Sequence, residues 1–141
     1  MKEELRFKKE TPPPADEFHT QFIRLVNPQD RPVLIAHLQR YEKDPLGIYL
    51  KNIRKHKGKI PTEKLGELFE QVIQTMNVER RETLYAHIAN AAILRLFTRA
   101  GAIEIPHHHR MVGKKSYPLT SISKENLGKV AEKLKKLAPK P

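Results

Sequence analysis

The sequence predicts a mainly α-helical domain with one β-hairpin near its C-terminus. Up to position 100, apolar residues recur mostly at intervals of three and four, which is the spacing of an amphipathic helix. From position 102 they alternate with polar residues, as they do in strands. Gly101 stands where the period changes, and glycine commonly ends a helix.

Prolines and charges divide the chain into an arm, a body and a tail. Three consecutive prolines at 12–14 exclude a helix and favour an extended spacer, so residues 1–14 are predicted to form a flexible charged arm. A chain of 141 residues is long enough for one domain with a buried core. We therefore expect a single helical domain over 15–137, with the hairpin at 102–122, and a short tail over 138–141.

Three short helices are predicted between positions 16 and 55. Asn27-Pro28 ends the first, Asp30 caps the second, and Asp44-Pro45 separates the second from the third, because Asp caps helices and proline fits their first turn. The apolar residues that would face the core are Phe18, Phe22, Leu25 and Val26, then Leu34, Leu38 and Tyr41, then Leu46, Tyr49, Leu50 and Ile53.

Two longer helices are predicted in the centre of the chain. After Thr62, apolar residues keep helical spacing as far as Met76, which makes a full amphipathic face. Residues 80–100 are apolar almost all round after Leu84, with Asn90 as the only plausible hinge. A helix of that kind lies in the centre of a fold or in a subunit interface.

The C-terminal part predicts a hairpin and a last helix. Residues 102–105 and 117–122 alternate as strands, and Pro118 confines the second strand to a sheet edge. The basic loop 106–115 between them contains Gly113, which tolerates a positive φ. A final amphipathic helix begins at Ser123 and carries lysines on its outer side.

The charge of the chain predicts a polyanionic partner. It has 27 Lys and Arg against 16 Asp and Glu, a formal net charge of +11, and the cations gather in 51–59, 110–115 and 124–140. Because a domain this basic repels itself, the phosphates of nucleic acid are the expected partner. The four tyrosines are too dispersed for a base-stacking platform, so duplex DNA is favoured over RNA or a single strand.

Several other classes of site are excluded. The chain has no cysteine, hence no disulfide and no thiolate ligand. Neighbouring residues of a strand point to opposite faces, so at most two of the histidines at 107–109 could share an ion, and no native metal site is expected. No apolar stretch approaches the ~20 residues of a membrane span, and the charged first ten residues lack a signal-peptide core. We expect a cytoplasmic protein without cofactor or membrane contact.

The order of elements over residues 62–122 resembles the winged-helix family of DNA-binding domains. Helices precede a buried helix, a glycine, a strand, a basic loop and a second strand. The stretch LFTRAGAI at 96–103 looks like the end of a recognition helix that enters the wing. The resemblance implies that the buried helix meets the major groove and that the hairpin tip follows the phosphate backbone.

These interpretations define one set of candidate nucleic-acid contacts. The two basic loops would hold phosphates, and the polar stripe of 80–100 would reach base edges, where Asn pairs with adenine and Arg with guanine. The alternative is a solvated helix end, since cations there are favoured by the helix dipole, and a stripe that only meets solvent. The candidates are Lys51, Arg54, Lys55, Lys57, Lys59, His87, Asn90, Arg95, Arg99, His109, Arg110, Lys114 and Lys115.

Catalysis is not predicted. The chain has no Gly-x-Ser-x-Gly motif and no glycine-rich phosphate loop, and no acidic residue stands beside the serines at 116–123 in a triad-like arrangement. We therefore predict a non-enzymatic protein that binds duplex DNA. The alternative hypothesis is a structural or assembly subunit, of a viral particle, a secretion or conjugation machine, or a ribonucleoprotein, in which the apolar helix 84–97 packs against another subunit. A homo-oligomer fits either hypothesis.

Overall fold

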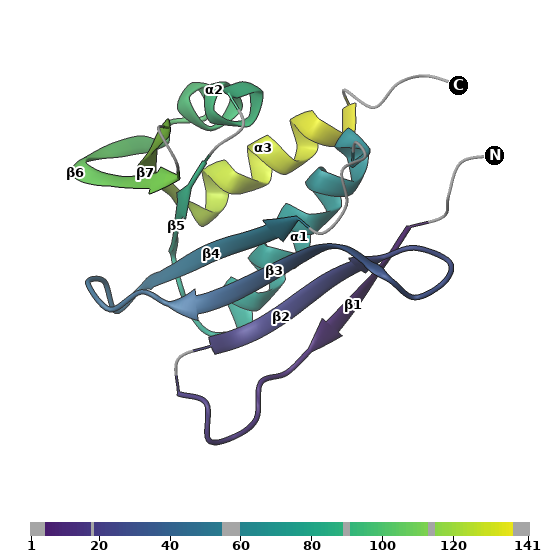
Figure 1. Cartoon of the computed structure of the whole chain (residues 1–141). Helices are drawn as coiled ribbons and strands as arrows, with labels where there is room; N and C mark the ends of the chain where they lie inside the picture. Colours follow the sequence, from purple (N-terminus) through teal and green to yellow (C-terminus); the bar gives the residue numbers. More distant parts are fainter. Residues whose placement is uncertain (1–4, 18, 55–59, 89–90, 113–114, 137–141) are drawn as a thin grey trace.

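The computed structural model describes residues 5–17, 19–54, 60–88, 91–112 and 115–136, and there the chain forms a mixed seven-stranded sheet with three helices (Figure 1). The expected mainly α-helical fold is therefore wrong. The elements are β1 (Arg6–Glu10), β2 (His19–Val26), β3 (Pro32–Arg40), β4 (Gly47–Arg54), α1 (Thr62–Val78), β5 (Thr83–His87), α2 (Ala91–Arg99), β6 (Ile103–Val112), β7 (Lys115–Ser123) and α3 (Lys124–Lys136).

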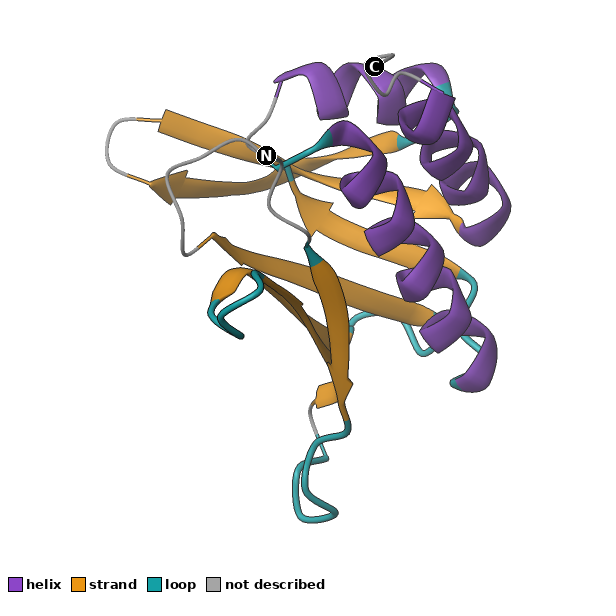
Figure 2. Cartoon of the chain, turned by 90° about the vertical axis from the view of Figure 1, so that its right-hand side faces the viewer, coloured by secondary structure: helices purple, strands orange, loops and turns teal. Residues whose placement is uncertain are grey.

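The sheet has the strand order β1-β2-β3-β4-β5-β7-β6. Strands β1 to β4 form an antiparallel meander, and β7 is antiparallel to both β5 and β6. Strands β4 and β5 are parallel, so the chain needs a crossover between them, which α1 provides. The helices lie on one side of the sheet (Figure 2), and we call the opposite side the open face.

The core fills the space between the sheet and the helices. Side chains with at most 1% exposure come from both layers, among them Ile23, Leu38, Ile48, Leu84, Leu68, Val72, Met76, Leu127 and Leu134. Helices α1 and α3 approach closely at Gly66, where an added Cβ would lie 2.7 Å from the carbonyl oxygen of Ala131. Phe97 holds α2 against α1, with its ring centroid 5.5 Å from that of Phe69.

The segments predicted as three short helices form β2, β3 and β4. In β3 the side chains of Leu34, Ala36 and Leu38 are all buried, which is the period of two of a strand. A spacing of four residues fits both a strand and a helix, so Leu34 and Leu38 did not discriminate between them. Ala36 decides the question, because a helix would turn it away from its two neighbours.

The dipeptides predicted to end and cap helices lie in hairpin turns instead. Asn27 Oδ1 accepts hydrogen bonds from the backbone N–H groups of Gln29 and Arg31, and Asp30 adopts a left-handed conformation with φ of 64°. In the next turn, Asp44 Oδ1 accepts from the N–H of Leu46. Asn and Asp accept bonds of this kind in turns as readily as at helix starts, which explains the error.

Residues 80–100 are not one helix. Their first part forms β5, in which Leu84 and Ala86 are buried on the core side, and their second part forms α2. The apolar residues of this segment follow two different periods, because β5 buries alternate residues on the core side while α2 buries Phe97. The predicted hinge Asn90 lies outside the described residues. The apolar helix 84–97, on which the assembly hypothesis depended, is therefore wrong.

Three other elements agree with the prediction. Helix α1 begins at Thr62, although Pro61 occupies its N-cap position. Helix α3 follows the last strand and buries Leu127, Val130, Ala131 and Leu134. The hairpin is present as β6 and β7, but its strands continue through the predicted loop to residues 112 and 115, with a shift of register between Ile105 and Arg110.

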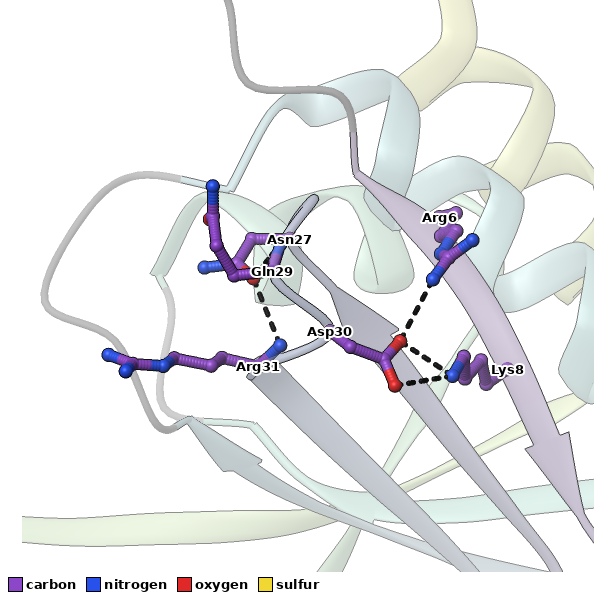
Figure 3. Close-up of polar contacts among 6 residues, drawn as sticks. All are labelled: Arg6, Lys8, Asn27, Gln29, Asp30 and Arg31. Atoms are coloured by element: carbon purple, nitrogen blue, oxygen red, sulfur yellow. Dashed lines mark hydrogen bonds and ion pairs between the residues drawn. The ribbon is translucent and has the colours of Figure 1, made fainter.

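Strand β1 lies within the segment predicted to be a flexible arm. It pairs antiparallel with β2 at the edge of the sheet, and Phe7 is half-buried against the core. Asp30 in the β2–β3 turn anchors it, because its carboxylate accepts from Arg6 at 2.9 Å and from Lys8 at 2.7 Å (Figure 3). These ion pairs keep the pKa of Asp30 below its usual value. The predicted tail 138–141 lies outside the described residues.

Candidate functional site

The parallel pairing of β4 with β5 is short, and the two strands part beyond it. The partners are Gly47 with Thr83, Ile48 with Leu84, and Tyr49 with Tyr85. Strand β4 nevertheless continues to Arg54, paired with β3, and β5 continues to His87, paired with β7. We call the facing edges beyond this point the β4–β5 gap. A strand edge that lacks a partner strand offers backbone N–H and C=O groups to a ligand.

On the open face, Tyr85 links β5 to the turn between β3 and β4, at the end where β4 and β5 are paired. Its hydroxyl donates to Asp44 Oδ2 at 2.7 Å, and its ring stacks on Tyr41 with centroids 4.0 Å apart. Gly47 makes room for this ring, since a Cβ there would lie 2.6 Å from its Cε2 atom. Burial and the neighbouring Asp44 carboxylate raise the pKa of Tyr85 to about 12, so the hydroxyl remains a donor at neutral pH.

Tyr49 and His87 join the two strands where the gap begins. The Tyr49 hydroxyl lies 2.7 Å from His87 Nδ1, and the two rings meet edge to face with centroids 5.6 Å apart. If the hydroxyl donates, Nε2 of the neutral ring carries the proton. If Nδ1–H donates to the hydroxyl oxygen, Nε2 is a base. The pair can therefore hold a proton at the edge of the gap.

A patch of cationic and aromatic side chains continues across the open face from β4 to β2. We define the open-face patch as Lys51, His37, Phe22 and His19. Lys51 and His37 are register partners, and the ring of Phe22 lies 4.9 Å from that of His37. Burial, and then the positive charges of His19, Lys51 and Arg24, lower the pKa of His37.

Helix α1 begins beyond the gap, after the segment that links it to β4. Its first turn has no side-chain cap, and Pro61 supplies only its carbonyl oxygen to the N–H groups of Lys64 and Leu65. Free N–H groups at a helix start attract anions. The lysines at 55, 57 and 59 precede this turn in sequence and lie outside the described residues.

Of the candidate contacts predicted from sequence, those whose side chains the structure describes do not form one surface. Lys51 on β4 and His87 on β5 lie on strands that flank the gap, whereas Arg95 and Arg99 are exposed on α2. For Arg54, His109, Arg110 and Lys115 only the strand backbone is described. Lys55, Lys57, Lys59, Asn90 and Lys114 lie outside the described residues. The binding role of these side chains stays a prediction.

Sequence reasoning missed the residues at the start of the gap. Tyr49 and Tyr85 were dismissed as too dispersed, yet the parallel register makes them direct partners. Asp44 was assigned to a helix cap, although its carboxylate accepts from Tyr85. An available signal was the alternation of Tyr85 with buried neighbours up to His87, which is the pattern of a strand and places both on one face.

Other features of the surface lie away from this place. A depression of about 430 Å³ between α1 and α3 is lined by Glu70, Gln74, Glu132 and Lys135, on the helix side of the sheet. Within the described ranges, no group of three metal-binding side chains occurs. No described helix has the length and apolar character needed to cross a membrane.

The fold is similar to that of solved acetyltransferases. The spermidine N-acetyltransferase from Vibrio cholerae, in complex with CoA and spermine, matches 80% of this chain and 70% of its own, with a TM-score of 0.57 and 14% identity. A GNAT-family acetyltransferase from Staphylococcus aureus Mu50 matches 73% and 67%, with a TM-score of 0.55 and 17% identity. A probable acetyltransferase from Staphylococcus epidermidis also matches 73% and 67%, with a TM-score of 0.54 and 19% identity. No family model and no curated protein matches the sequence.

These likenesses correct the functional predictions. The chain has the acetyltransferase fold rather than the winged-helix fold, because the LFTRAGAI stretch leads from α2 into a strand of a large mixed sheet. The predicted DNA-binding function and nucleic-acid partner depended on the winged-helix interpretation and on net charge, and the predicted absence of catalysis depended on the lack of known catalytic motifs. The shared fold overturns them, since the matched structures are acetyltransferases.

Proposed function

We propose that this chain is an acyltransferase that moves an acyl group from a CoA thioester to an amine. The parting of β4 and β5 after three residue pairs carries this proposal, because it leaves two strand edges that no described strand pairs with, which suits an extended ligand. The similarity in fold to acetyltransferases, one of them solved with CoA, supports it. The Tyr49–His87 pair at the start of the gap supplies a proton-accepting group for the reaction.

The residues around the gap match the chemistry of CoA. Its pantetheine arm is extended and contains two amides, which can pair with the unpartnered edge of β4 much as an added strand does. Its diphosphate suits the N–H groups in the first turn of α1, where anions are favoured. The surplus of cations, +11 over the chain, attracts the phosphates of the same molecule over a longer range.

Bound CoA would supply an activated acyl carbonyl, and the protein would position the amine and take its proton. The amine nitrogen forms a bond to that carbonyl carbon while the carbon–sulfur bond breaks. The proton leaves the nitrogen for His87 Nε2, and the departing thiolate takes a proton from solvent, to which His87 later returns its own. When Nδ1–H donates to the Tyr49 hydroxyl oxygen, Nε2 is the nitrogen that can accept the amine proton, so we assign Tyr49 a positioning role.

The experiment combines binding with turnover. Calorimetric titration with CoA should give saturable binding to one site, and acetyl-CoA with a panel of amines should release free thiol. Leu50→Trp, which enlarges a core side chain of β4 at the start of the gap, should weaken CoA binding, whereas exposed Lys129→Gln on α3 should not. Circular dichroism checks that Leu50→Trp, whose native side chain is 4% exposed, stays folded. The wild-type protein's failure to bind CoA in low-salt buffer would contradict the proposal.

A further inference from the structure

We propose that the amine acceptor is a small molecule that carries an anionic group, a carboxylate or a phosphate, and that Lys51 and His37 of the open-face patch bind this group. The inference rests on the proposed function, because it names the class of acceptor that meets the thioester. It differs from the cationic substrate named for the Vibrio cholerae structure, spermidine.

Access to the gap favours the open face. Helices α1 and α3 cover the other side of the sheet, as Figure 2 shows, so the second substrate reaches the β4–β5 gap from the side without helices. Lys51 follows Tyr49 by two residues on β4 and shares its face, because side chains alternate along a strand. Its register partner His37 extends the same row onto β3.

The charged groups that act on His37 are all cationic. They are His19, Lys51 and Arg24, and all of them lower the pKa of His37 as cations do. Lys51 makes no ion pair with the residues that the structure describes. Three carboxylates at the margins of the face already have partners: Asp16 with His19 at 2.9 Å, Glu10 with Arg24 at 3.2 Å, and Asp44 with Tyr85 at 2.7 Å.

The physical consequence is a preference for anions. A carboxylate or phosphate beside Lys51 would pair with a half-buried ammonium group that has no described partner, and such charge-assisted bonds are among the stronger hydrogen bonds. A polyamine would bring further positive charge to a face that is already positive. The ring of Phe22 against His37 adds an apolar wall for the carbon skeleton of the acceptor.

Direct binding tests this inference without any turnover. We would titrate the protein with two matched pairs, O-phosphoethanolamine against ethanolamine and glycine against glycinamide, and with spermidine. In at least one pair, the member that carries the carboxylate or phosphate should bind about tenfold more tightly than the match that lacks it. The pair that shows the difference tells phosphate from carboxylate. Lys51→Gln should abolish the preference, and Lys129→Gln, which removes the same charge from the opposite side, should retain it.

Three outcomes would overturn the inference: equal binding within both pairs, tighter binding of spermidine, or an unchanged preference in Lys51→Gln. A fourth is a loss of CoA affinity in Lys51→Gln as large as the loss for the anionic amine, which would assign Lys51 to the CoA site. The proposed function fails separately. If the anionic amine binds but CoA does not, the anion site is supported and the proposed function is contradicted. If CoA binds and spermidine is the best acceptor, the acyltransferase function is supported and the anion site is contradicted.

Discussion

Tyr49 and Tyr85 are direct partners across the parallel strands, yet they reach in opposite directions. Tyr85 points back over Gly47 to Asp44 in the β3–β4 turn and stacks on Tyr41. Tyr49 points forward to His87, where the strands part. Two identical side chains at one register position therefore serve different ends of the same strand pair.

The difference teaches that position relative to the gap decides the role of a tyrosine here. The ring of Tyr85 stacks on Tyr41 and its hydroxyl donates to Asp44, so both parts of this side chain already have partners within the fold. The Tyr49 hydroxyl pairs with the imidazole of His87, which can carry a proton on either ring nitrogen. Changes at the Tyr85 end should alter stability, and changes at the Tyr49 end should alter chemistry.

The largest effect is expected for His87→Gln. Glutamine keeps a polar group but cannot take the amine proton, so the rate of thiol release should fall by about 100-fold or more. The midpoint of urea unfolding should change little. An unchanged rate, with CoA still bound, would remove His87 from the mechanism.

Tyr49→Phe should give a smaller loss of rate, because His87 remains but its tautomer is no longer fixed. The measurement that separates positioning from structure is the dependence of kcat/KM on pH. Its acidic limb should shift in Tyr49→Phe, whereas Tyr85→Phe should leave the limb in place. A shift in both variants would contradict the division between the two tyrosines.

Gly47→Ala should destabilise the fold by about 1–3 kcal/mol, the usual range for overpacking. The added methyl group would lie 2.6 Å from the Tyr85 ring, which would have to leave its stacking position. Denaturant unfolding measures the effect. The double variant Gly47→Ala with Tyr85→Ala should show less than the sum of the two single losses, because the clash is then absent. Strict additivity would show that the ring is not the cause.

Tyr85→Phe should cost about 1 kcal/mol, the typical net value of one hydrogen bond. The folded-state pKa of Tyr85 is about 12, above the value of 10.0 for the free side chain, so the folded state holds this proton more tightly. Its contribution is complete below pH 10 and is lost as pH rises from 10 to 12. The unfolding free energy of the wild type should therefore decline over that window more steeply than that of Tyr85→Phe.

His37 should produce the smallest effect, at the acidic end. Burial and surrounding cations depress its folded-state pKa below 6.5, so the unfolded chain binds the proton more tightly. Stability should be complete above that pH and decline as pH falls through and below it. His37→Gln should flatten this decline in thermal unfolding curves. If the decline in stability with falling pH were the same in both proteins, His37 would not contribute to it.

Local patterns predicted the parts of the fold that depend on local sequence. Helix α1 was predicted because helical spacing continues unbroken for more than four turns. The last two strands were predicted because the period of the apolar residues changes at Gly101. Strands β2 to β4 were lost because pairs such as Leu34 and Leu38 fit both periods, and because Asn27 and Asp44 cap helices and turns alike. The regular spacing of turn residues between runs of about eight residues is typical of strands and would have favoured them here.

The candidate site could not be predicted for a different reason. It is created by the pairing of β4 with β5, whose tyrosines are far apart in sequence and are brought together by the α1 crossover. Nothing near Tyr49 in the sequence reveals where that pairing stops. The cation surplus was real, but net charge carries information about attraction and none about fold, so it led to the wrong class of partner.

The attachment of β1 has a consequence for handling the protein. Its ties to Asp30 are solvent-exposed ion pairs, with 60% of Arg6 and 51% of Asp30 accessible, and such pairs contribute little and weaken with salt. Concentrated electrolyte should therefore loosen this edge strand more than the rest of the sheet, while its pairing with β2 and the packing of Phe7 remain, and faster hydrogen exchange in β1 would detect it. When β1 detaches, the exposed edge of β2 can pair with β1 of a second molecule, so precipitation in high salt would begin at the N-terminal strand.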